Sequence, residues 1–300
     1  MAVVVRAPGK INLQLSVGPL KSNGYHDLAT VFQAVSLFDD VTVEKNDSDK
    51  ITISADSKVP IPLGEENLAY RAAALMIKEF RLPRGISILI KKEIPVAGGM
   101  AGGSADAAAT IVAMDSLFNL ALKRNEMEAL GATLGADVPF SISGGTAIGV
   151  GHGDQLTPVL SRGTYNWVLA LSTSGLSTPA VYKECDRLRE GMDLAQPHIK
   201  ETLLSALGSG NAQELGRELN NDLQAAACSL KPALRLIIDV GLDYGALGGI
   251  VSGSGPTVAF LAENEEHALD LIVALTSSGV VGNVIRASGP VHGARVIESS

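Results

Sequence analysis

The chain has 300 residues, 46% of them hydrophobic, which is enough for one large domain or two ordinary ones. Its 24 basic residues are outnumbered by 32 acidic ones, and the formal charge of -8 argues against a broad basic surface for a nucleic acid or an anionic membrane. Any anionic ligand is therefore expected to be bound locally, by backbone dipoles or single cations.

The two cysteines, Cys185 and Cys228, lack the spacing of a metal site or a redox pair, so a reducing compartment and no disulfide are expected. The apolar stretch at residues 1–8 is too short for a signal peptide, and no uncharged run is long enough to span a membrane. These features predict a cytoplasmic protein.

The first predicted element is a strand at residues 11–17, in which apolar side chains alternate with polar ones. This pattern predicts one buried face and one wetter face, and Lys10 and Asn12 share the polar face. A lysine at such a strand end is usually a solvated charge. Lys10 alone therefore indicates no function.

Gly24, Tyr25 and His26 follow a turn at residues 22–23, so an aromatic ring and an imidazole are expected together on a loop. The alternative without any function is a buried tyrosine and a surface histidine.

Three further strands are predicted in the first part of the chain, from short β-branched runs separated by polar turns. They are expected at residues 41–43, 50–53 and 86–90. Residues 67–80 are rich in alanine and leucine and predict a helix between the last two strands.

A glycine-rich run joins an extended segment to a helix that is predicted to begin near Ser104. The run consists of Pro95, Val96, Ala97, Gly98, Gly99, Met100, Ala101, Gly102, Gly103 and Ser104, followed by Ala105. Backbone N–H groups of such a loop converge on phosphate oxygens, the positive end of the helix adds a favourable field, and glycine permits close approach. The residues alone do not decide between a phosphate cradle and a flexible connection. The run matches neither the P-loop nor the dinucleotide-binding pattern.

The helix predicted at residues 104–118 is rich in alanine and apolar almost all round, which is typical of a helix buried on several sides. Its start is therefore expected inside the protein, at a cleft. Asp106 in its first turn would repel an unscreened phosphate, which implies a metal ion or a side chain that points outward.

A second helix, with Asn125 as its expected N-cap, ends near residues 134–135 and leads to Asp137. Pro139 biases Val138 away from the helical conformation, so Asp137 is predicted to be a loop carboxylate just past a helix end. A lone aspartate in such a loop is usually a turn or capping residue.

Turn residues at 144–145, 149–154 and 161–163 place a domain boundary near residue 160, after which strands alternate with helices. The strands are predicted at residues 167–171, 249–251, 257–261 and 281–285, and the helices at residues 232–240 and 265–277. The segment 252–257 joins two of these strands and is either an anion-binding turn or a tight connection.

Taken in order, three segments resemble the GHMP small-molecule kinases, a group that includes galactokinase, homoserine kinase and mevalonate kinase. These segments are residues 7–13, 95–109 and 252–257. Residues 24–28 are the most discriminating, because they are similar to members whose alcohol substrate carries a cytidine diphosphate group. Supporting similarities are at residues 66–68, 135–140 and 221–223. The second segment reads Gly-Gly-Met-Ala-Gly-Gly-Ser where Gly-Leu-Gly-Ser-Ser is commoner, but this glycine-dense form also occurs in those members.

The resemblance implies an α+β fold of two domains, with a cleft between them. The first, residues 1–160, would be a nucleotide-binding half similar to domain 2 of ribosomal protein S5. The second, residues 161–300, would be a ferredoxin-like half that holds substrate.

The resemblance also implies that the chain transfers the γ-phosphate of ATP, with Mg²⁺, to the 2-hydroxyl of an alcohol in the non-mevalonate isoprenoid pathway. Asp137 would accept the hydroxyl proton, and Lys10 would hold both that carboxylate and the attacking oxygen. Because a lysine beside a carboxylate favours its ionised form, positioning is expected to matter more than base strength.

The resemblance assigns the remaining site residues to substrate or ATP. Tyr25 would stack on cytosine, His26 would bond its edge, and Tyr182 would face it from the other domain, where other members often have phenylalanine. The other residues assigned are Thr178 and Asn12 for substrate, and Asn67, Lys92 and Ser104 for ATP, with Ser104 on either a phosphate or the metal. The alternatives for Asn67 and Lys92 are a helix cap and a solvated strand-end cation.

Two rival functions follow from the same residues. One keeps the fold but changes the alcohol, as in a homoserine or mevalonate-type kinase, and residues 24–26 argue against it because those substrates have no nucleobase. The other is a nucleotide-binding regulator without catalysis, which the presence of both Lys10 and Asp137 disfavours. No obligate protein partner is inferred.

Overall fold

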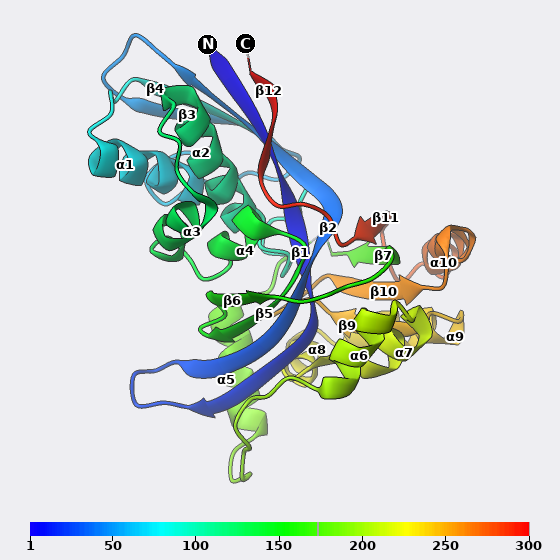
Figure 1. Cartoon of the computed structure of the whole chain (residues 1–300). Helices are drawn as coiled ribbons and strands as arrows, with labels where there is room; N and C mark the ends of the chain where they lie inside the picture. The colour runs from blue at the N-terminus through cyan, green and yellow to red at the C-terminus, as the bar shows by residue number, and fades with distance from the viewer. Residues whose placement is uncertain (173, 300) are drawn as a thin grey trace.

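The computed structural model describes residues 1–172 and 174–299, which form helices around two β-sheets (Figure 1). Two long antiparallel strands, β1 (Ala2–Leu20) and β2 (His26–Lys45), form a ribbon that runs through the larger sheet. The larger sheet also contains β3 (Ile51–Asp56), β4 (Ile86–Lys91), β5 (Thr146–Gly151), β6 (Gln155–Pro158), β8 (Asn220–Asn221) and β12 (Arg295–Ser299). The segment predicted as a strand at 41–43 is thus only the end of the 20-residue β2.

The larger sheet divides along β2. Its first half pairs with β5 and its second half pairs with β4, which in turn pairs in parallel with the edge strand β3. The smaller sheet has the order β11-β7-β10-β9 and is antiparallel throughout. Its strands are β7 (Tyr165–Leu171), β9 (Gly248–Val251), β10 (Val258–Ala262) and β11 (Asn283–Gly289).

The alanine-rich helix α2 (Gly102–Phe118) is buried on several sides, as its composition predicts. It packs against β1, β2 and three helices, and small alanine side chains allow that close approach. Those helices are α1 (Leu68–Phe80), α3 (Arg124–Ala132) and α4 (Val138–Ser143). All four lie on one side of the β1–β2 ribbon in Figure 1, and the smaller sheet lies on the other.

The remaining helices follow β7. They are α5 (Thr178–Leu188), α6 (Glu201–Ser209), α7 (Ala212–Glu218), α8 (Gln224–Leu230), α9 (Ala233–Asp243) and α10 (Glu265–Ser277). The prediction for residues 265–277 is confirmed at both ends. None of the helices in the described ranges combines the length and the apolarity needed to cross a membrane.

Three local predictions about helix ends are wrong. Helix α3 begins at Arg124, so its N-cap is Lys123 and Asn125 lies inside the helix. Helix α4 begins at Val138, directly before Pro139, because the first turn of a helix needs no N–H donor from proline. Helix α2 begins at Gly102, two positions before Ser104, which puts Asp106 beyond the first turn.

The last strand returns to the first. Arg295–Ser299 pairs antiparallel with Val3–Arg6 at the edge of the larger sheet, so the two ends of the chain lie side by side (Figure 1). The larger sheet therefore takes strands from both sides of residue 160, and a boundary at that position stays a prediction.

Candidate active site

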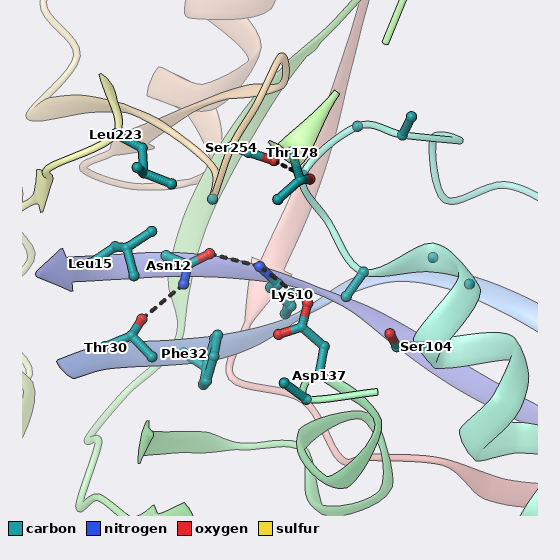
Figure 2. A pocket seen from close by; sticks show the side chains of 18 of the residues that line it. Lys10, Asn12, Leu15, Thr30, Phe32, Ser104, Asp137, Thr178, Leu223 and Ser254 are labelled. Carbon is teal, nitrogen blue, oxygen red and sulfur yellow. Dashed lines mark hydrogen bonds and ion pairs between the residues drawn. The ribbon is translucent and has the colours of Figure 1, made fainter. Parts of the chain in front are cut away.

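A cleft of about 440 Å³ lies where the β1–β2 ribbon meets the glycine-rich loop, the start of α4 and the start of α5 (Figure 2). Its lining brings together segments that are far apart in the sequence. The lining residues are Lys10, Asn12, Leu15, Leu28, Thr30, Phe32, Leu68, Pro95, Ala97, Gly98, Gly99, Ala101, Gly102, Gly103, Ser104, Ala136, Asp137, His152, Thr178, Tyr182, Leu223, Gly253 and Ser254.

Lys10 and Asp137 face each other in this cleft (Figure 2). Lys10 is only 6% exposed, and its Nζ donates to Asn12 Oδ1 at 2.8 Å and lies 3.8 Å from Asp137 Oδ2. Asn12 in turn donates to Thr30 Oγ1 at 2.8 Å. The polar face of β1 was expected to be the wetter one, but Lys10 and Asn12 are buried in the cleft lining and Gln14 is buried against the segment at residues 198–200.

Asp137 reaches the cleft from the residue that precedes α4. Its side chain is 34% exposed, whereas that of Lys10 is 7% exposed, so the carboxylate is open to a ligand while the ammonium is held by the protein. The chain therefore offers an oxygen acceptor beside a fixed positive charge.

The glycine-rich loop has a backbone that ordinary residues rarely adopt. Ala97, Gly99 and Ala101 have φ angles of 50°, 76° and 59°, and left-handed residues of this kind occur in loops whose backbone N–H groups form an anion-binding concavity. A side chain at Gly99 would overlap the carbonyl oxygen of Ser252. The loop is thus a fixed turn packed against the smaller sheet and not a flexible connection.

The segment 252–257 supports this loop. Ser252 Oγ donates to the carbonyl of Gly99 at 3.0 Å, and the N–H of Thr257 donates to the carbonyl of Gly98 at 3.2 Å. Gly253 and Ser254 from the same segment line the cleft. It is therefore a tight connection that also forms part of the site.

Two tyrosine–imidazole pairs lie at the other end of the cleft. Tyr25 is 62% exposed and meets His152 edge-on, with ring centroids 5.2 Å apart. His26 is 8% exposed and lies beside Tyr182, with centroids 5.4 Å apart. A buried tyrosine and a surface histidine were the alternative for residues 25 and 26, and the structure has the reverse.

The imidazole of His26 is engaged by the protein on both sides. Its Nδ1 lies 2.8 Å from the carbonyl of Gly18, and its Nε2 lies 3.4 Å from Asp186 Oδ1. Burial, with the nearby charge of Asp137, raises the pKa of the Tyr182 hydroxyl above its usual range, so Tyr182 is neutral at physiological pH. Tyr182 thus offers a neutral aromatic face to the cleft.

Comparisons with known proteins identify the family. The model of the GHMP kinases N terminal domain matches residues 67–145, and that of the GHMP kinases C terminal domain matches residues 203–281. The chain belongs to the GHMP kinase family. Its α+β fold of two domains, implied by the resemblance, is thereby confirmed.

Individual relatives of this GHMP kinase carry a more specific name. Proteins named 4-diphosphocytidyl-2-C-methyl-D-erythritol kinase from Mycolicibacterium smegmatis and Nocardia farcinica are 51% and 50% identical, each over 99% of this chain and over 92% and 96% of their own lengths. A crystal structure of 4-(cytidine 5'-diphospho)-2C-methyl-D-erythritol kinase matches with a TM-score of 0.78 at 33% identity, over 96% of this chain and 98% of that one. Homoserine kinase from Cytophaga hutchinsonii has a TM-score of 0.76 at 19% identity, over 99% of this chain and 97% of that one, and shares the fold.

Several residues predicted to bind ATP or substrate do not line the cleft of this GHMP kinase. Asn67 is the N-cap of α1, where its side chain accepts from the N–H of Ala69 at 2.8 Å. The side chain of Lys92 is 5% exposed and paired with two aspartates, so it is not a solvated cation. Also outside the lining are Tyr25, His26, Val96, Met100 and Ala105, of which Met100 and Ala105 are in the hydrophobic core.

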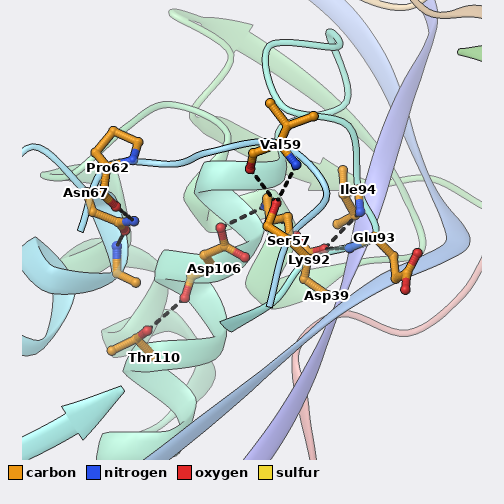
Figure 3. Close-up of polar contacts among 11 residues, drawn as sticks. Asp39, Ser57, Val59, Pro62, Asn67, Lys92, Glu93, Ile94, Asp106 and Thr110 are labelled. Carbon is orange, nitrogen blue, oxygen red and sulfur yellow. Dashed lines mark hydrogen bonds and ion pairs between the residues drawn. The ribbon is translucent and has the colours of Figure 1, made fainter. Parts of the chain in front are cut away.

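Asp106 does not point outward, which was one of the two expectations for it. It is 2% exposed, and its Oδ2 lies 2.7 Å from Lys92 Nζ (Figure 3). Asp106 is thus paired with a buried ammonium and lies outside the cleft lining.

Three other residues at the cleft were not predicted from the sequence. Thr30 and Phe32 lie on β2, where Thr30 holds Asn12 and Phe32 lies under the Lys10 ammonium at 5.4 Å. His152 comes from the turn between β5 and β6. The glycines on either side of His152 are the only sequence signal of an exposed turn there, and nothing local to them indicates the contact with Tyr25.

Proposed function

We propose that this GHMP kinase transfers the γ-phosphate of ATP to the 2-hydroxyl of 4-diphosphocytidyl-2-C-methyl-D-erythritol, in the non-mevalonate isoprenoid precursor pathway. The observation that carries the proposal is the Lys10–Asp137 pair, 3.8 Å apart, in the same cleft as the glycine-rich loop. Relatives about half identical over nearly the whole chain, which bear the name of that kinase, support the choice of substrate.

The geometry suits phosphoryl transfer, which depends mostly on positioning and on neutralising charge. The partly exposed carboxylate of Asp137 accepts the proton of the attacking hydroxyl, and the Lys10 ammonium holds that oxygen and the carboxylate together. Asn12 fixes the direction of the ammonium through its 2.8 Å hydrogen bond. Loop N–H groups at the start of α2 receive the phosphate oxygens.

Mg²⁺ fits this site as a partner of the phosphates. Among the described residues no group of three or more histidine, cysteine or acidic side chains could hold a metal by itself. Magnesium in kinases is bound by phosphate oxygens and water with few protein ligands, and Ser104 in the cleft offers a hydroxyl for that purpose. The ion would neutralise charge that develops on the phosphate oxygens.

We assign the other end of the cleft to the cytosine base. Tyr182 offers a face from α5 and Tyr25 offers one from the tip of the β1–β2 ribbon, while Thr178 and Asn12 offer polar groups between the base and the phosphates. His26 supports Tyr182 and has one weak partner, Asp186 at 3.4 Å, which a cytosine edge can replace. Asn67 at the start of α1 remains a proposed adenosine residue beside Leu68 in the lining.

A panel of alcohols tests the proposal. ATP turnover, coupled to ADP release, is measured with 4-diphosphocytidyl-2-C-methyl-D-erythritol, homoserine and mevalonate. We expect turnover with the cytidylyl alcohol at least a hundredfold above the other two, since only it can use the aromatic end. Equal or greater turnover with homoserine or mevalonate would reject this substrate, and no turnover with any alcohol would favour a nucleotide-binding regulator.

The setting of this activity stays a prediction from the sequence. We place it in the cytoplasm, with no nucleic acid, membrane or obligate protein partner, and we assign residues 1–160 mainly to the nucleotide and 161–300 mainly to the substrate.

A further inference from the structure

A buried polar cluster lies behind the glycine-rich loop, outside the cleft lining (Figure 3). It consists of Asp39 on β2, Lys92 just after β4 and Asp106 on α2, whose side chains are 0%, 5% and 3% exposed. Lys92 Nζ lies 2.5 Å from Asp39 Oδ2 and 2.7 Å from Asp106 Oδ2. Burying three ionisable groups is costly, and a well-packed apolar trio is often at least as stable, so stability alone does not explain the cluster.

The cluster fixes the chain on both sides of the loop. Asp39 Oδ1 accepts from the backbone N–H of Glu93 at 2.7 Å and of Ile94 at 2.8 Å, the two residues that precede Pro95. On the far side of the loop, Asp106 on α2 is tied to the same ammonium. The spacing between the end of β4 and the start of α2 is therefore set by one side chain, that of Lys92.

The ammonium also packs against the first residue of α2. A side chain at Gly102 would place its Cβ 2.8 Å from Lys92 Nζ and 3.1 Å from Ile94 Cγ2, so only glycine fits above the cluster. Gly102 and Gly103 line the cleft at this helix start. A shift of the ammonium would therefore move the N–H groups that face the phosphates.

We infer that the cluster of Asp39, Lys92 and Asp106 positions the glycine-rich loop for the nucleotide phosphates, with the Lys92 side chain acting through the loop and not by contact with adenosine. The inference rests on the proposed kinase function. It assigns to Lys92 the role of a positioning residue, because its side chain touches the loop and not the cleft.

The cluster holds Asp106 through one of its two carboxyl oxygens. Asp106 Oδ1 has no hydrogen-bond partner among the described residues, and burial is the main cause that raises the pKa of Asp106 to about 8, against the opposing effect of Lys92. Asp39 and Lys92 are the charged groups that face it. Oδ2 is therefore the atom of Asp106 that ties α2 to the cluster, through the Lys92 ammonium.

The test uses a variant that removes the ammonium with one of its carboxylates. Lys92→Met/Asp106→Leu leaves Asp39 Oδ1 with its two backbone donors, which still stabilise the carboxylate after Oδ2 has lost the ammonium. Dissociation constants are measured for ADP and, by displacement of ADP, for inorganic tripolyphosphate. Both are expected to weaken about tenfold and by the same factor, because both ligands use the loop.

A contact between the Lys92 side chain and adenosine would weaken ADP alone, and this outcome would overturn the inference. So would unchanged binding of both ligands in a variant with native circular dichroism. Lys91→Met is the matched control, since Lys91 is the exposed neighbour at the end of β4 and its variant should bind both ligands as the wild type does.

Asp106→Asn keeps the shape of the side chain and provides a second measurement if the double variant fails to fold. It weakens the contact between α2 and the Lys92 ammonium, so the affinities for ADP and tripolyphosphate are expected to fall by the same factor, and by less than in the double variant. A loss of affinity for ADP alone would contradict the inference. Neither binding test uses an alcohol. Their results can therefore be interpreted even if the alcohol panel rejects the proposed substrate.

Discussion

At the glycine-rich end of the cleft, the groups proposed to bind phosphate are mostly backbone atoms held by buried packing, whereas at the other end the groups proposed to bind cytosine are aromatic side chains. The loop is fixed by Ser252 in front and by the Lys92 cluster behind. At the other end Tyr25 is 62% exposed, and the neighbour that its ring contacts is His152. The loop is thus held by buried polar contacts, whereas Tyr25 is held by one edge-on ring contact at the surface.

The difference follows from what each end must recognise. Phosphates are the same in every ATP-dependent kinase, and backbone N–H groups bind them without depending on side-chain identity. A nucleobase is recognised by rings and hydrogen-bonding edges, which only side chains provide. Changes at the loop should therefore act through backbone displacement, and changes at the aromatic end should act through the loss of single contacts.

The largest effect is expected between the two ends. Asp137→Asn keeps the shape of the side chain but removes the proton acceptor, so kcat should fall by about 10²–10⁴-fold while the apparent affinities for ATP and alcohol change little. Single-turnover kinetics measure the chemical step directly. Asp243→Asn, at the end of α9, is the control. A near-normal rate of the chemical step in the Asp137 variant would contradict the role of Asp137 as proton acceptor.

Displacing the loop backbone should have the next largest effect. Gly99→Ala puts a methyl group onto the Ser252 carbonyl at a φ of +76°, so the loop must move and the KM for ATP should rise about tenfold or more. Initial rates at varied ATP measure this. Gly279→Ala is the control, because Gly279 has a similar φ of +71° but open space around it. Its effect measures the backbone strain of a positive φ without the overlap with the Ser252 carbonyl. Equal effects of the two variants would mean that contact with residue 252 is unimportant.

Removing an aromatic face should affect the alcohol alone. Tyr25→Ala is expected to raise the KM for the cytidylyl alcohol about tenfold, since stacking of a base on an aromatic ring contributes about 1–3 kcal/mol. The KM for ATP should stay within twofold, and Tyr25→Phe should keep most of the affinity. Tyr244→Ala is the control, because it removes another exposed tyrosine, the residue directly after α9. An unaltered KM in Tyr25→Ala would contradict the stacking assignment.

The smallest effect concerns stability. Because burial raises the pKa of Asp106 from 3.8 to about 8, the folded protein holds a proton in this window that the unfolded chain has released. The free energy of unfolding should therefore fall as pH rises from about 4 to about 8. Between pH 6 and pH 8 the wild type should lose about 2–4 °C more in Tm than Asp106→Asn. Equal losses would mean that Asp106 is ionised in the folded protein throughout.

The parts that could be predicted from the sequence are those governed by short-range patterns. The glycine-rich loop, the buried helix after it and the limits of α10 follow from composition and periodicity over neighbouring residues. Pro139 shows the limit of such rules. A proline interrupts the interior of a helix, but it is accepted within the first turn, where Pro139 lies in α4. Whether Pro139 ends a helix or belongs to its first turn therefore depends on the exact residue at which the helix begins.

The parts that could not be predicted depend on contacts between distant segments. Lys92 and Asp39 are 53 positions apart, and nothing near either residue indicates that both are buried. His152 and Tyr25 meet only because β5 pairs with the first half of β2. The pairing of Lys10 with Asp137 was expected only from the resemblance to a family, since no local pattern indicates that these two residues face each other.

The return of β12 to β1 makes the order of synthesis matter. When a ribosome has released the glycine-rich loop and α2, the outer edge of β1 still lacks the strand that covers Val3–Arg6, because Arg295–Ser299 is synthesised much later. A pairing over that sequence distance forms late, and an uncovered strand edge invites pairing with other chains. A tail cut before Arg295 would leave that edge open for good, so shortened versions should be prone to association even though every residue of the cleft is present.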